Sequence, residues 1–365
     1  MVIDTGVATL DAAAHASTVP VRAGLEIDAA TLEAYLAIHV SGFKGPLHAR
    51  QFRGGQSNPT YLISTKSAQY VLRRKPPGVL LASAHAVERE YRVMQALGAE
   101  GSVPVPRMHH LCMDATVIGT AFYVMEYVQG RILWDPALPD VARPLRQDHA
   151  LAVVRALAAL HRVDPVRAGL SDFGRPEGYV ARQIARWSDQ YLKETSAGRC
   201  AALDRLVEWL PAHIPAITPP SAIVHGDYRI DNTVFHPTAP TLLAILDWEL
   251  ATLGDPLADF AYHLMVYRLP SLSIPGLAGH DLTALGLPSE SEYVSAYCEA
   301  AGIPTVPNLE FYLAYTMFRL AAIFHGIAGR VARGTAVSDK AREYAGQVDT
   351  MAEYAWRQAQ SLGDA

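Results

Sequence analysis

The 365-residue chain is long enough for two lobes that each bury a hydrophobic core. Half of its residues are hydrophobic and 18% are charged, which excludes an intrinsically disordered protein. Its net charge of −5 comes without a dense basic cluster, and this argues against nucleic acid or an anionic membrane as the main partner.

The cysteines and the first residues bear on the compartment. Cys112, Cys200 and Cys298 are scattered and odd in number, which favours a reducing, cytoplasmic location and buried packing over a metal site. Asp4 and Asp11 interrupt the N-terminal residues, which therefore lack the apolar core of a signal peptide. We find no apolar run of transmembrane length.

The first part of the chain predicts a small sheet. Residues 1–25 form a tail without clear periodicity, and Asp28 is suited to cap a helix that ends near Gly42. Alternating apolar residues then predict three antiparallel strands, over 49–53, 60–64 and 69–74.

The turn between the first two of these strands contains Gly55, Gln56, Ser57 and Asn58. Glycine permits tight backbone geometry, so exposed N–H groups in this turn could receive phosphate oxygens. The alternative is an ordinary hairpin turn without a binding function, in which Gly-Gly and Asn-Pro pairs are common.

A helix predicted over 83–97, closed by Gly98, follows the third strand. Glu90 falls inside the apolar stripe of this helix, where a carboxylate needs a cation. Arg73 is the natural partner, because it ends the strand on which the helix packs. Alternation sends Arg73 and Arg74 to opposite faces, and the alternative for Glu90 is solvent at the lobe edge.

Two more strands, over 108–112 and 121–128, complete the strand-rich part. Helical patterns begin after Gly130, so we place the lobe boundary between 128 and 131. The further predicted helices cover 148–161, 178–194, 201–212, a segment beginning at Asp255-Pro256, 290–300, 309–331 and 338–360.

The most informative stretch runs from His225 to Asn232, between two short apolar runs. Asp227 is a candidate base, and Asn232 and Asp247 are oxygen ligands of the kind that suits Mg²⁺. The spacing His-x-Asp-x-x-x-x-Asn is that of a protein-kinase catalytic loop. The alternative is that His225 and Asp227 only stabilise a turn.

Taken in order, these motifs resemble the aminoglycoside phosphotransferase and choline kinase-like family. Its most specific parts are the run from His225 to Asn232, the segment Leu246-Asp247-Trp248-Glu249 and the run from Gly254 to Asp259. The likeness is greatest to the branch associated with acyl-CoA dehydrogenases. It implies an α+β, protein-kinase-like two-lobe fold, with an N-lobe of antiparallel sheet plus helix and a mainly helical C-lobe.

The resemblance implies lobes, cofactors and roles. The expected regions are an N-terminal tail over 1–25, a nucleotide-binding N-lobe over 26–128 and a C-lobe over 129–365 with the catalytic loop and the acceptor site. ATP and Mg²⁺ are the expected cofactors, with Asp227 as catalytic base. The expected metal ligands are Asn232 and Asp247. The expected nucleotide-binding residues are Gly55, Gln56, Ser57, Asn58, Arg73, Glu90, Glu126 and Tyr127.

The same resemblance makes His225 a structural loop residue that Asp259 braces by hydrogen bonds, while Asp255 either begins its helix or supports the metal hairpin. Arg73 stands where the family often has Lys, and its planar fork changes the geometry of the pair with Glu90. Asp247-Trp248-Glu249 replaces the Asp-Phe-Gly of protein kinases, so a glycine-dependent switch is not expected.

The predicted function is a small-molecule kinase that transfers the γ-phosphate of Mg-ATP to a hydroxyl. Aromatic residues of the C-terminal helices favour a neutral or acidic, partly apolar acceptor, such as a hydroxyacyl compound, although such a run is usually core. These residues are Phe311, Tyr312, Tyr315, Phe318 and Phe324, with Arg319 and Arg330 nearby.

Other classes stay open. They are a nucleotide-binding module without turnover, a true aminoglycoside phosphotransferase and, faintly, a metallophosphoesterase, whose further motifs the sequence lacks. We predict no nucleic-acid or membrane partner, and a homodimer is left open.

Overall fold

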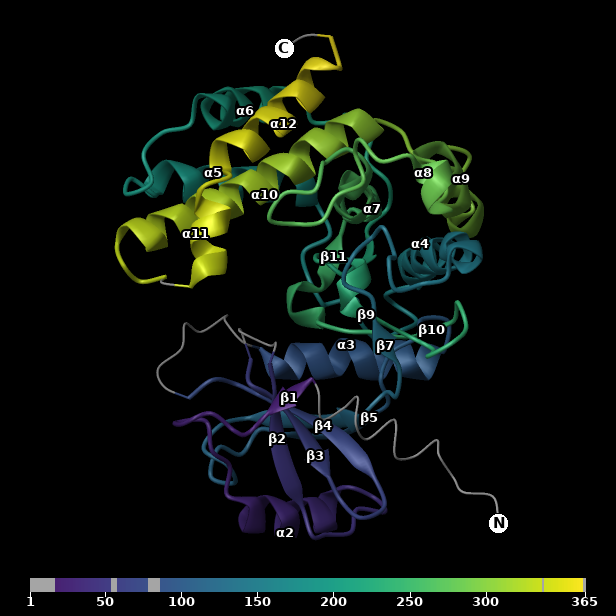
Figure 1. Cartoon of the computed structure of the whole chain (residues 1–365), viewed down its shortest axis with the longest axis vertical. Coiled ribbons are helices and arrows are strands. Elements are labelled where there is room, and N and C mark those ends of the chain that lie inside the picture. Colours follow the sequence, from purple (N-terminus) through teal and green to yellow (C-terminus); the bar gives the residue numbers. More distant parts are fainter. Residues whose placement is uncertain (1–16, 54–57, 78–85, 337, 364–365) are drawn as a thin grey trace. The chain divides into compact units, whose positions relative to one another are not determined.

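The computed structural model describes residues 17–53, 58–77, 86–336 and 338–363 (Figure 1). The chain divides into two compact units. The first unit comprises Met1–Arg131 and Leu243–Glu249, and the second comprises Ile132–Leu242 and Leu250–Ala365. Gly55, Gln56 and Ser57 of the predicted phosphate loop lie outside the described residues.

The first unit is built on a sheet that has six antiparallel strands among the described residues, in the order β1-β2-β3-β4-β6-β5. The strands are β1 (Thr18–Val19), β2 (His48–Phe52), β3 (Thr60–Ser64), β4 (Gln69–Arg74), β5 (Met108–Cys112) and β6 (Phe122–Glu126). Five of them were predicted. The strand β1 was not, because it lies in the segment that was interpreted as a tail.

Helices α2 (Ala29–His39) and α3 (Val87–Glu100) lie on opposite faces of this sheet (Figure 1). Leu32 and Leu36 of α2 pack into the same buried cluster as Leu72 of β4. Arg73, the next residue of β4, points to the other face and contacts Glu90 of α3. Period-2 alternation along β4 thus places Leu72 in the cluster under α2 and Arg73 in the layer under α3.

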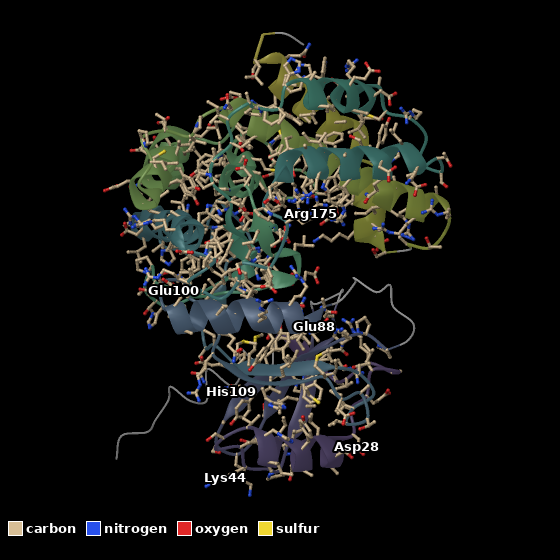
Figure 2. All side chains as sticks on the ribbon, turned by 180° about the vertical axis from the view of Figure 1, so that it is seen from behind. Asp28, Lys44, Glu88, Glu100, His109 and Arg175 are labelled. Atoms are coloured by element: carbon tan, nitrogen blue, oxygen red, sulfur yellow. The ribbon has the colours of Figure 1, made fainter. Side chains whose placement is uncertain are left out.

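The ends of these helices test the predicted caps. Asp28 caps α2 as predicted: its Oδ1 accepts from the N–H of Ala30 at 3.0 Å and of Thr31 at 3.2 Å (Figure 2 labels Asp28). The predicted end of α3 at Gly98 is wrong. The helix continues to Glu100 and ends at Gly101, whose φ of 86° is the left-handed conformation that glycine adopts without strain.

Arg74 is buried although it points away from Arg73. Its Nη2 donates to the carbonyl of Leu25 at 2.9 Å, and its Nη1 donates to that of Ile118 at 3.3 Å. The hydroxyl of Tyr61 also donates to the Leu25 carbonyl, at 2.8 Å. The segment before α2 therefore covers this face of the sheet, and it was not recognised from the sequence.

Leu243–Glu249 is a second contribution to the first unit from far along the chain. It includes most of β10 (Leu242–Ile245) and the start of the 3-10 turn Trp248–Leu250. The N–H of Ile245 donates to the carbonyl of Pro104 at 2.9 Å, and Arg73 binds Asp247. The sequence interpretation had assigned Asp247 to the helical lobe, whereas these contacts group it with the sheet.

The second unit is mainly helical, as the sequence predicted. Its long helix α10 (Leu309–Ala332) packs against α5, α6, α7, α11 and α12 (Figure 1). The other helices are α4 (Arg146–Arg162), α5 (Tyr179–Lys193), α6 (Ala201–Ala212), α7 (Pro256–Leu264), α8 (Leu282–Leu285), α9 (Glu290–Ala301), α11 (Asp339–Ala345) and α12 (Val348–Gln360). Its short strands are β8 (Ala222–Val224), β9 (Thr233–Phe235) and β11 (Thr252–Gly254), and β8 pairs antiparallel with β11. Strand β7 (Arg131–Ile132) begins at the last residue of the N-terminal segment of the first unit.

Two expectations about the C-terminal helices need correction. The helix predicted over 338–360 is two helices, α11 and α12, separated at Gly346. We also expected no apolar run of transmembrane length. Among the described residues, however, one helix, α10, is both long enough and apolar enough to cross a membrane. Of its most apolar window, 83% is buried inside the structure, as is typical of a core helix.

Candidate active site

The loop after β8 carries His225, Gly226 and Asp227, and one face of α7 holds it. Asp259 of α7 accepts from the N–H of His225 at 2.7 Å and from the N–H of Gly226 at 2.9 Å. This is the predicted brace. Gly226 has a φ of 82°, and a Cβ there would lie 2.8 Å from the carbonyl oxygen of Leu250, so the turn requires glycine.

Asp259 is fully buried, yet it remains an anion. Burial alone would raise its pKa, but the hydrogen bond from His161 and the neighbouring His225 hold the pKa of Asp259 below its ordinary value. The Nε2 of His161 lies 3.3 Å from the Oδ2 of Asp259.

Asp255 begins the same helix by accepting from the N–H of Leu257 at 2.8 Å, which confirms the simpler of its two predicted roles.

Asp227 has different neighbours at its two carboxylate oxygens. The hydroxyl of Tyr262 donates to Oδ1 at 2.6 Å, and the Nε of Arg229 lies 3.8 Å from the same oxygen. The Nδ2 of Asn232 donates to the main-chain carbonyl of Asp227 at 2.9 Å and lies 3.4 Å from Oδ2. Because the Asn232 nitrogen is used in this way, its amide oxygen is the group left to serve as a metal ligand.

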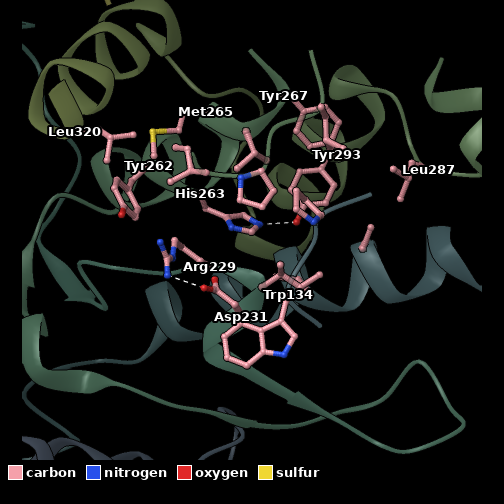
Figure 3. Close-up of a pocket in the computed structure, with 18 residues that line it drawn as sticks. Trp134, Arg229, Asp231, Tyr262, His263, Met265, Tyr267, Leu287, Tyr293 and Leu320 are labelled. Atoms are coloured by element: carbon pink, nitrogen blue, oxygen red, sulfur yellow. Dashed lines mark hydrogen bonds and ion pairs between the residues drawn. The ribbon is translucent and has the colours of Figure 1, made fainter. Parts of the chain in front are cut away.

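Tyr262 and Arg229, the two side chains next to Oδ1 of Asp227, form part of the wall of a pocket in the second unit (Figure 3). Asp227 itself is not one of the residues that line this pocket. Most of the remaining wall is aliphatic: Met265, Val266, Ile274, Leu277, Leu287 and Leu320. Trp134 also lines it, with 67% of its surface exposed.

Two pairs of polar side chains in this wall contact each other. Arg229 donates to Asp231 at 2.6 Å, so the two charges offset (Figure 3). His263 and the hydroxyl of Tyr293 share a hydrogen bond of 2.6 Å. Burial lowers the pKa of His263 to about 4, so this histidine is neutral at neutral pH. The wall is therefore mostly apolar, and the charges of Arg229 and Asp231 offset each other.

In the first unit, Arg73 is surrounded by three carboxylates. Its Nε lies 3.1 Å from Glu90, and its Nη2 lies 2.8 Å from Asp247 and 3.2 Å from Glu249. The predicted pair of Arg73 and Glu90 is thus confirmed. One guanidinium thus contacts three carboxyl groups, of which those of Asp247 and Glu249 are partly exposed.

Glu90 is buried, with 1% of its surface exposed, which excludes the alternative that it reaches solvent. Asn58 donates to its Oε1 at 2.9 Å and the hydroxyl of Tyr123 donates to its Oε2 at 3.1 Å. Burial raises the pKa of Glu90 to about 7; the charge of Arg73 lowers this pKa only in part, and the negative charge of Asp247 raises it further. Asn58 therefore contacts the helix carboxylate, a partner that the sequence did not indicate.

Asp247 has a φ of 64°, one of the left-handed values at non-glycine residues among the described segments. Such backbone strain costs roughly 1–3 kcal/mol and is concentrated at functional sites. The next residue, Trp248, is buried, and its Nε1 donates to the Ile245 carbonyl at 2.9 Å, which anchors the turn. The strained turn holds a partly exposed carboxylate against Arg73.

The predicted hinge residues Glu126 and Tyr127 line a second pocket, which lies within the first unit. Gln69, Val105 and Leu243 contribute to the same pocket. The two residues predicted for the hinge therefore line one common pocket.

Some predictions need correction or addition. The aromatic residues proposed to line the acceptor site are core: Phe311, Tyr312, Tyr315, Phe318 and Phe324 are each at most 2% exposed. Tyr262 and Arg229, which do lie beside Asp227, were not singled out. The spacing of Tyr262 three residues after Asp259 on one helix is the signal that could have found it.

Two further observations concern metal ligands and cysteines. No group of three or more His, Cys, Asp or Glu side chains suited to a metal ion occurs in the part of the chain that the structure describes. Cys112, Cys200 and Cys298, all in described segments, are free and buried, as predicted.

Comparisons with known proteins identify the family. The sequence profile of the phosphotransferase enzyme family matches residues 48–312. Acyl-CoA dehydrogenase family member 10 of Mus musculus is 45% identical over 345 residues, which cover 93% of this chain and 32% of that protein. The chain thus spans about a third of the length of this relative and less than half of the similar family member 11 proteins.

Solved structures are similar as well. One from Ralstonia eutropha, named as an aminoglycoside phosphotransferase, is 46% identical, with a TM-score of 0.85 and coverage of 92% of this chain and 99% of that chain. Spectinomycin phosphotransferase APH(9)-Ia, solved with ADP and spectinomycin, is 14% identical with a TM-score of 0.59 over 92% of this chain and 99% of that chain, which shows the fold alone.

These likenesses confirm the predicted α+β, protein-kinase-like fold with two lobes. The relatives named as acyl-CoA dehydrogenase family members also agree with the predicted branch. Because the profile covers most of the chain, the chain belongs to the phosphotransferase enzyme family.

Proposed function

We propose that this chain is a small-molecule kinase that transfers the γ-phosphoryl group of Mg-ATP to a hydroxyl of a neutral or acidic, partly apolar acceptor. The observation that carries this proposal is the hydrogen bond from Tyr262, which lines a largely aliphatic pocket, to the carboxylate of Asp227. A fixed carboxylate next to a cavity is the arrangement that a general base for an acceptor hydroxyl requires.

In the proposed reaction Asp227 takes the proton of the acceptor hydroxyl. The acceptor oxygen bonds to the γ-phosphorus, and the bond from that phosphorus to the bridging oxygen breaks, leaving its electron pair on ADP. The transition state is loose, so positioning and charge neutralisation supply most of the catalysis.

The nucleotide roles are proposals from the first unit. Glu126 and Tyr127 would meet adenine, and Arg73, held by Glu90, would meet the phosphates. Gly55, Gln56, Ser57 and Asn58 remain the proposed phosphate loop. Asn232 and Asp247 would hold Mg²⁺, the role that the family resemblance implies for them, since each offers an oxygen ligand. The ion, when bound, would neutralise charge on the phosphate oxygens.

The pocket wall supports the proposed acceptor class. The charges of Arg229 and Asp231 offset each other, and His263 and Tyr293 satisfy each other, so the wall offers little to a polycation or a polyol. A sugar hydroxyl buried there without a partner would cost about 1–3 kcal/mol. A hydroxyl on an otherwise apolar chain, as in a hydroxyacyl compound, avoids that cost.

The names of the relatives supply a second, independent line of support. Acyl-CoA dehydrogenase family member 10 is named for chemistry on acyl compounds, and this chain is similar to part of it. An acyl chain with a hydroxyl group is therefore the first acceptor to test. The cytoplasm is the proposed compartment, because Cys112, Cys200 and Cys298 are free thiols.

A true aminoglycoside phosphotransferase is the second candidate, favoured by the name of the similar Ralstonia structure. A nucleotide-binding module without turnover is the third. The pocket wall speaks against a polycationic acceptor, and the ordered Asp227 speaks against the loss of turnover.

The test is release of ADP from Mg-ATP in the presence of an acceptor panel. The panel contains octanoates hydroxylated at carbon 2, 3, 4 or 8, as free acids and as CoA thioesters, together with glucose, choline and kanamycin. We expect the highest kcat/KM with a hydroxyoctanoate or its thioester. Preference for kanamycin would overturn the acceptor class, and nucleotide binding without turnover of any member would overturn the kinase.

A further inference from the structure

One face of α7 binds the catalytic loop at more than one point. Asp259 accepts from two main-chain N–H groups of the loop, and Tyr262, three residues later, donates to the side chain of Asp227. Residues three apart on a helix lie on the same face, so α7 presents both groups to the loop together. The brace by Asp259 fixes the backbone, but the function of Tyr262 is not explained by it.

Tyr262 makes the two oxygens of Asp227 inequivalent. Its hydroxyl lies 2.6 Å from Oδ1, a short bond of the kind that an ionised acceptor forms. Among the described residues, Oδ2 has the long contact of 3.4 Å with the amide of Asn232. One lone-pair direction of Oδ1 is therefore occupied, and Oδ2 is the oxygen available to a further proton.

Arg319 of α10 holds Tyr262 in this position. Its guanidinium carbon lies 4.7 Å from the centroid of the Tyr262 ring and 5.8 Å from that of Trp187. Its Nη2 donates to the carbonyl of Gly226 at 2.6 Å. A single buried cation thus contacts both the ring of Tyr262 and the peptide next to Asp227, which couples the two.

We propose that Tyr262 is a positioning residue that occupies Oδ1 of Asp227, so that Oδ2 takes the proton of the acceptor hydroxyl. This inference rests on the proposed function, because it assumes that Asp227 is the base. It also assigns Tyr262 a second contact, since the same side chain forms part of the pocket wall (Figure 3).

The ring and the hydroxyl of Tyr262 therefore have different tasks. The ring borders the pocket in which the acceptor lies, and the hydroxyl sets the rotation of the Asp227 carboxylate. Burial, and then the nearby Asp227, raise the pKa of Tyr262 well above its ordinary value. The phenol thus stays protonated and remains a donor while the base takes up the acceptor proton.

The test removes the hydroxyl alone. Tyr262→Phe keeps the ring over Arg319 and is expected to lower kcat about 10- to 100-fold, the range for loss of one hydrogen bond to a charged group. KM for ATP is expected to stay unchanged. Turnover is measured as ADP release with the hydroxyoctanoate that the acceptor panel selects, and also with Mg-ATP and water as the acceptor.

A double-mutant cycle separates positioning from a general structural effect. In an Asp227→Asn background, Tyr262→Phe is expected to change the residual rate by less than roughly 2-fold, because the oxygen that it positions no longer acts as a base. A merely structural role would lower the rate equally in both backgrounds.

Tyr191→Phe is the matched control. Tyr191 is also buried in the second unit, and its hydroxyl donates to a carboxylate, Asp204, at the same distance of 2.6 Å. It lies outside the pocket, so its variant is expected to keep kcat. Thermal melting of both variants shows whether each retains the fold.

The outcomes distinguish the two proposals. If Asp227→Asn turns over like the wild type, Asp227 is not the catalytic base and the proposed function is overturned. If Asp227→Asn is inactive but Tyr262→Phe keeps the wild-type kcat, or loses the same factor in both backgrounds, the role of Tyr262 is overturned and the kinase proposal stands.

Discussion

Replacement of Asp259 by Asn tests how the loop that carries His225, Gly226 and Asp227 is held. The wild-type carboxylate accepts from the N–H of His225 at 2.7 Å and of Gly226 at 2.9 Å, and from His161 at 3.3 Å. An amide has one oxygen where the carboxylate has two, and its NH₂ cannot accept. One buried loop N–H therefore loses its partner, and the other loses a charged acceptor.

The magnitude follows from those two losses. An unsatisfied buried N–H costs about 1–3 kcal/mol, and exchange of a charged for a neutral acceptor costs about another 1 kcal/mol. The sum of about 2–4 kcal/mol corresponds to roughly 30- to 1,000-fold more frequent opening of the loop. The overall fold is expected to persist, because the effect is local.

Hydrogen–deuterium exchange of the peptide over residues 222–232, followed by mass spectrometry, measures this opening. Exchange at His225 and Gly226 is expected to accelerate by the factor given above. Asp204→Asn is the control, since Asp204 accepts from Tyr191 elsewhere in the same unit. An acceleration below about 3-fold in Asp259→Asn, or an equal one in the control, would refute the reasoning.

Three further predictions concern single side chains. Arg73→Lys is expected to lower kcat at least about 10-fold, because a point charge cannot keep the contacts of both Nε and Nη2; unchanged turnover contradicts this. The pKa of Glu90 is raised from 4.5 to about 7 on folding, so its contribution to stability is present below pH 4.5 and is lost as the pH rises to about 7. Melting of wild type and Glu90→Gln across that range is expected to show the wild type losing stability relative to the variant, and a constant difference would contradict it. Gly226→Ala is expected to reduce activity strongly, because its Cβ would clash with Leu250 in addition to the left-handed backbone strain. Gly101→Ala is the control: it introduces the same kind of backbone strain, but its Cβ would have no neighbour within 4 Å, so kcat is expected to be kept.

Helices with local signals were predictable from the sequence. The Asp28 cap and the apolar periodicity of α4, α5, α6, α9 and α10 depend on neighbours within a few residues, and the structure has these helices at nearly the predicted bounds. The break between α11 and α12 at Gly346 was missed, because a single glycine inside a helical pattern is often tolerated.

Features that depend on distant partners were not predictable. The strand β1 has two residues and is defined by its pairing with β2, about thirty residues later. Leu243–Glu249 joins the first unit through contacts with Pro104 and Arg73, and no local pattern marks such contacts. Arg73 with Glu90 was an exception, since a carboxylate on a buried face requires a cation.

The same division holds for the site. Asp227 and Asn232 belong to one contiguous motif, so spacing alone singled them out. Tyr262 and Arg319 reach the loop from α7 and α10, and their roles depend on tertiary packing. The aromatic run of α10 misled the interpretation, because helical spacing of Tyr and Phe is the same for a core face as for a ligand site.

The central claim is that Asp227 is the base of a phosphoryl transfer to a hydroxyl. Its most direct test is the rate of ADP release from Mg-ATP with the acceptor panel, compared between wild type and Asp227→Ala. We predict acceptor-dependent turnover in the wild type and a loss of at least about 100-fold in the variant, with ATP binding retained. Equal turnover in the two proteins would contradict the account.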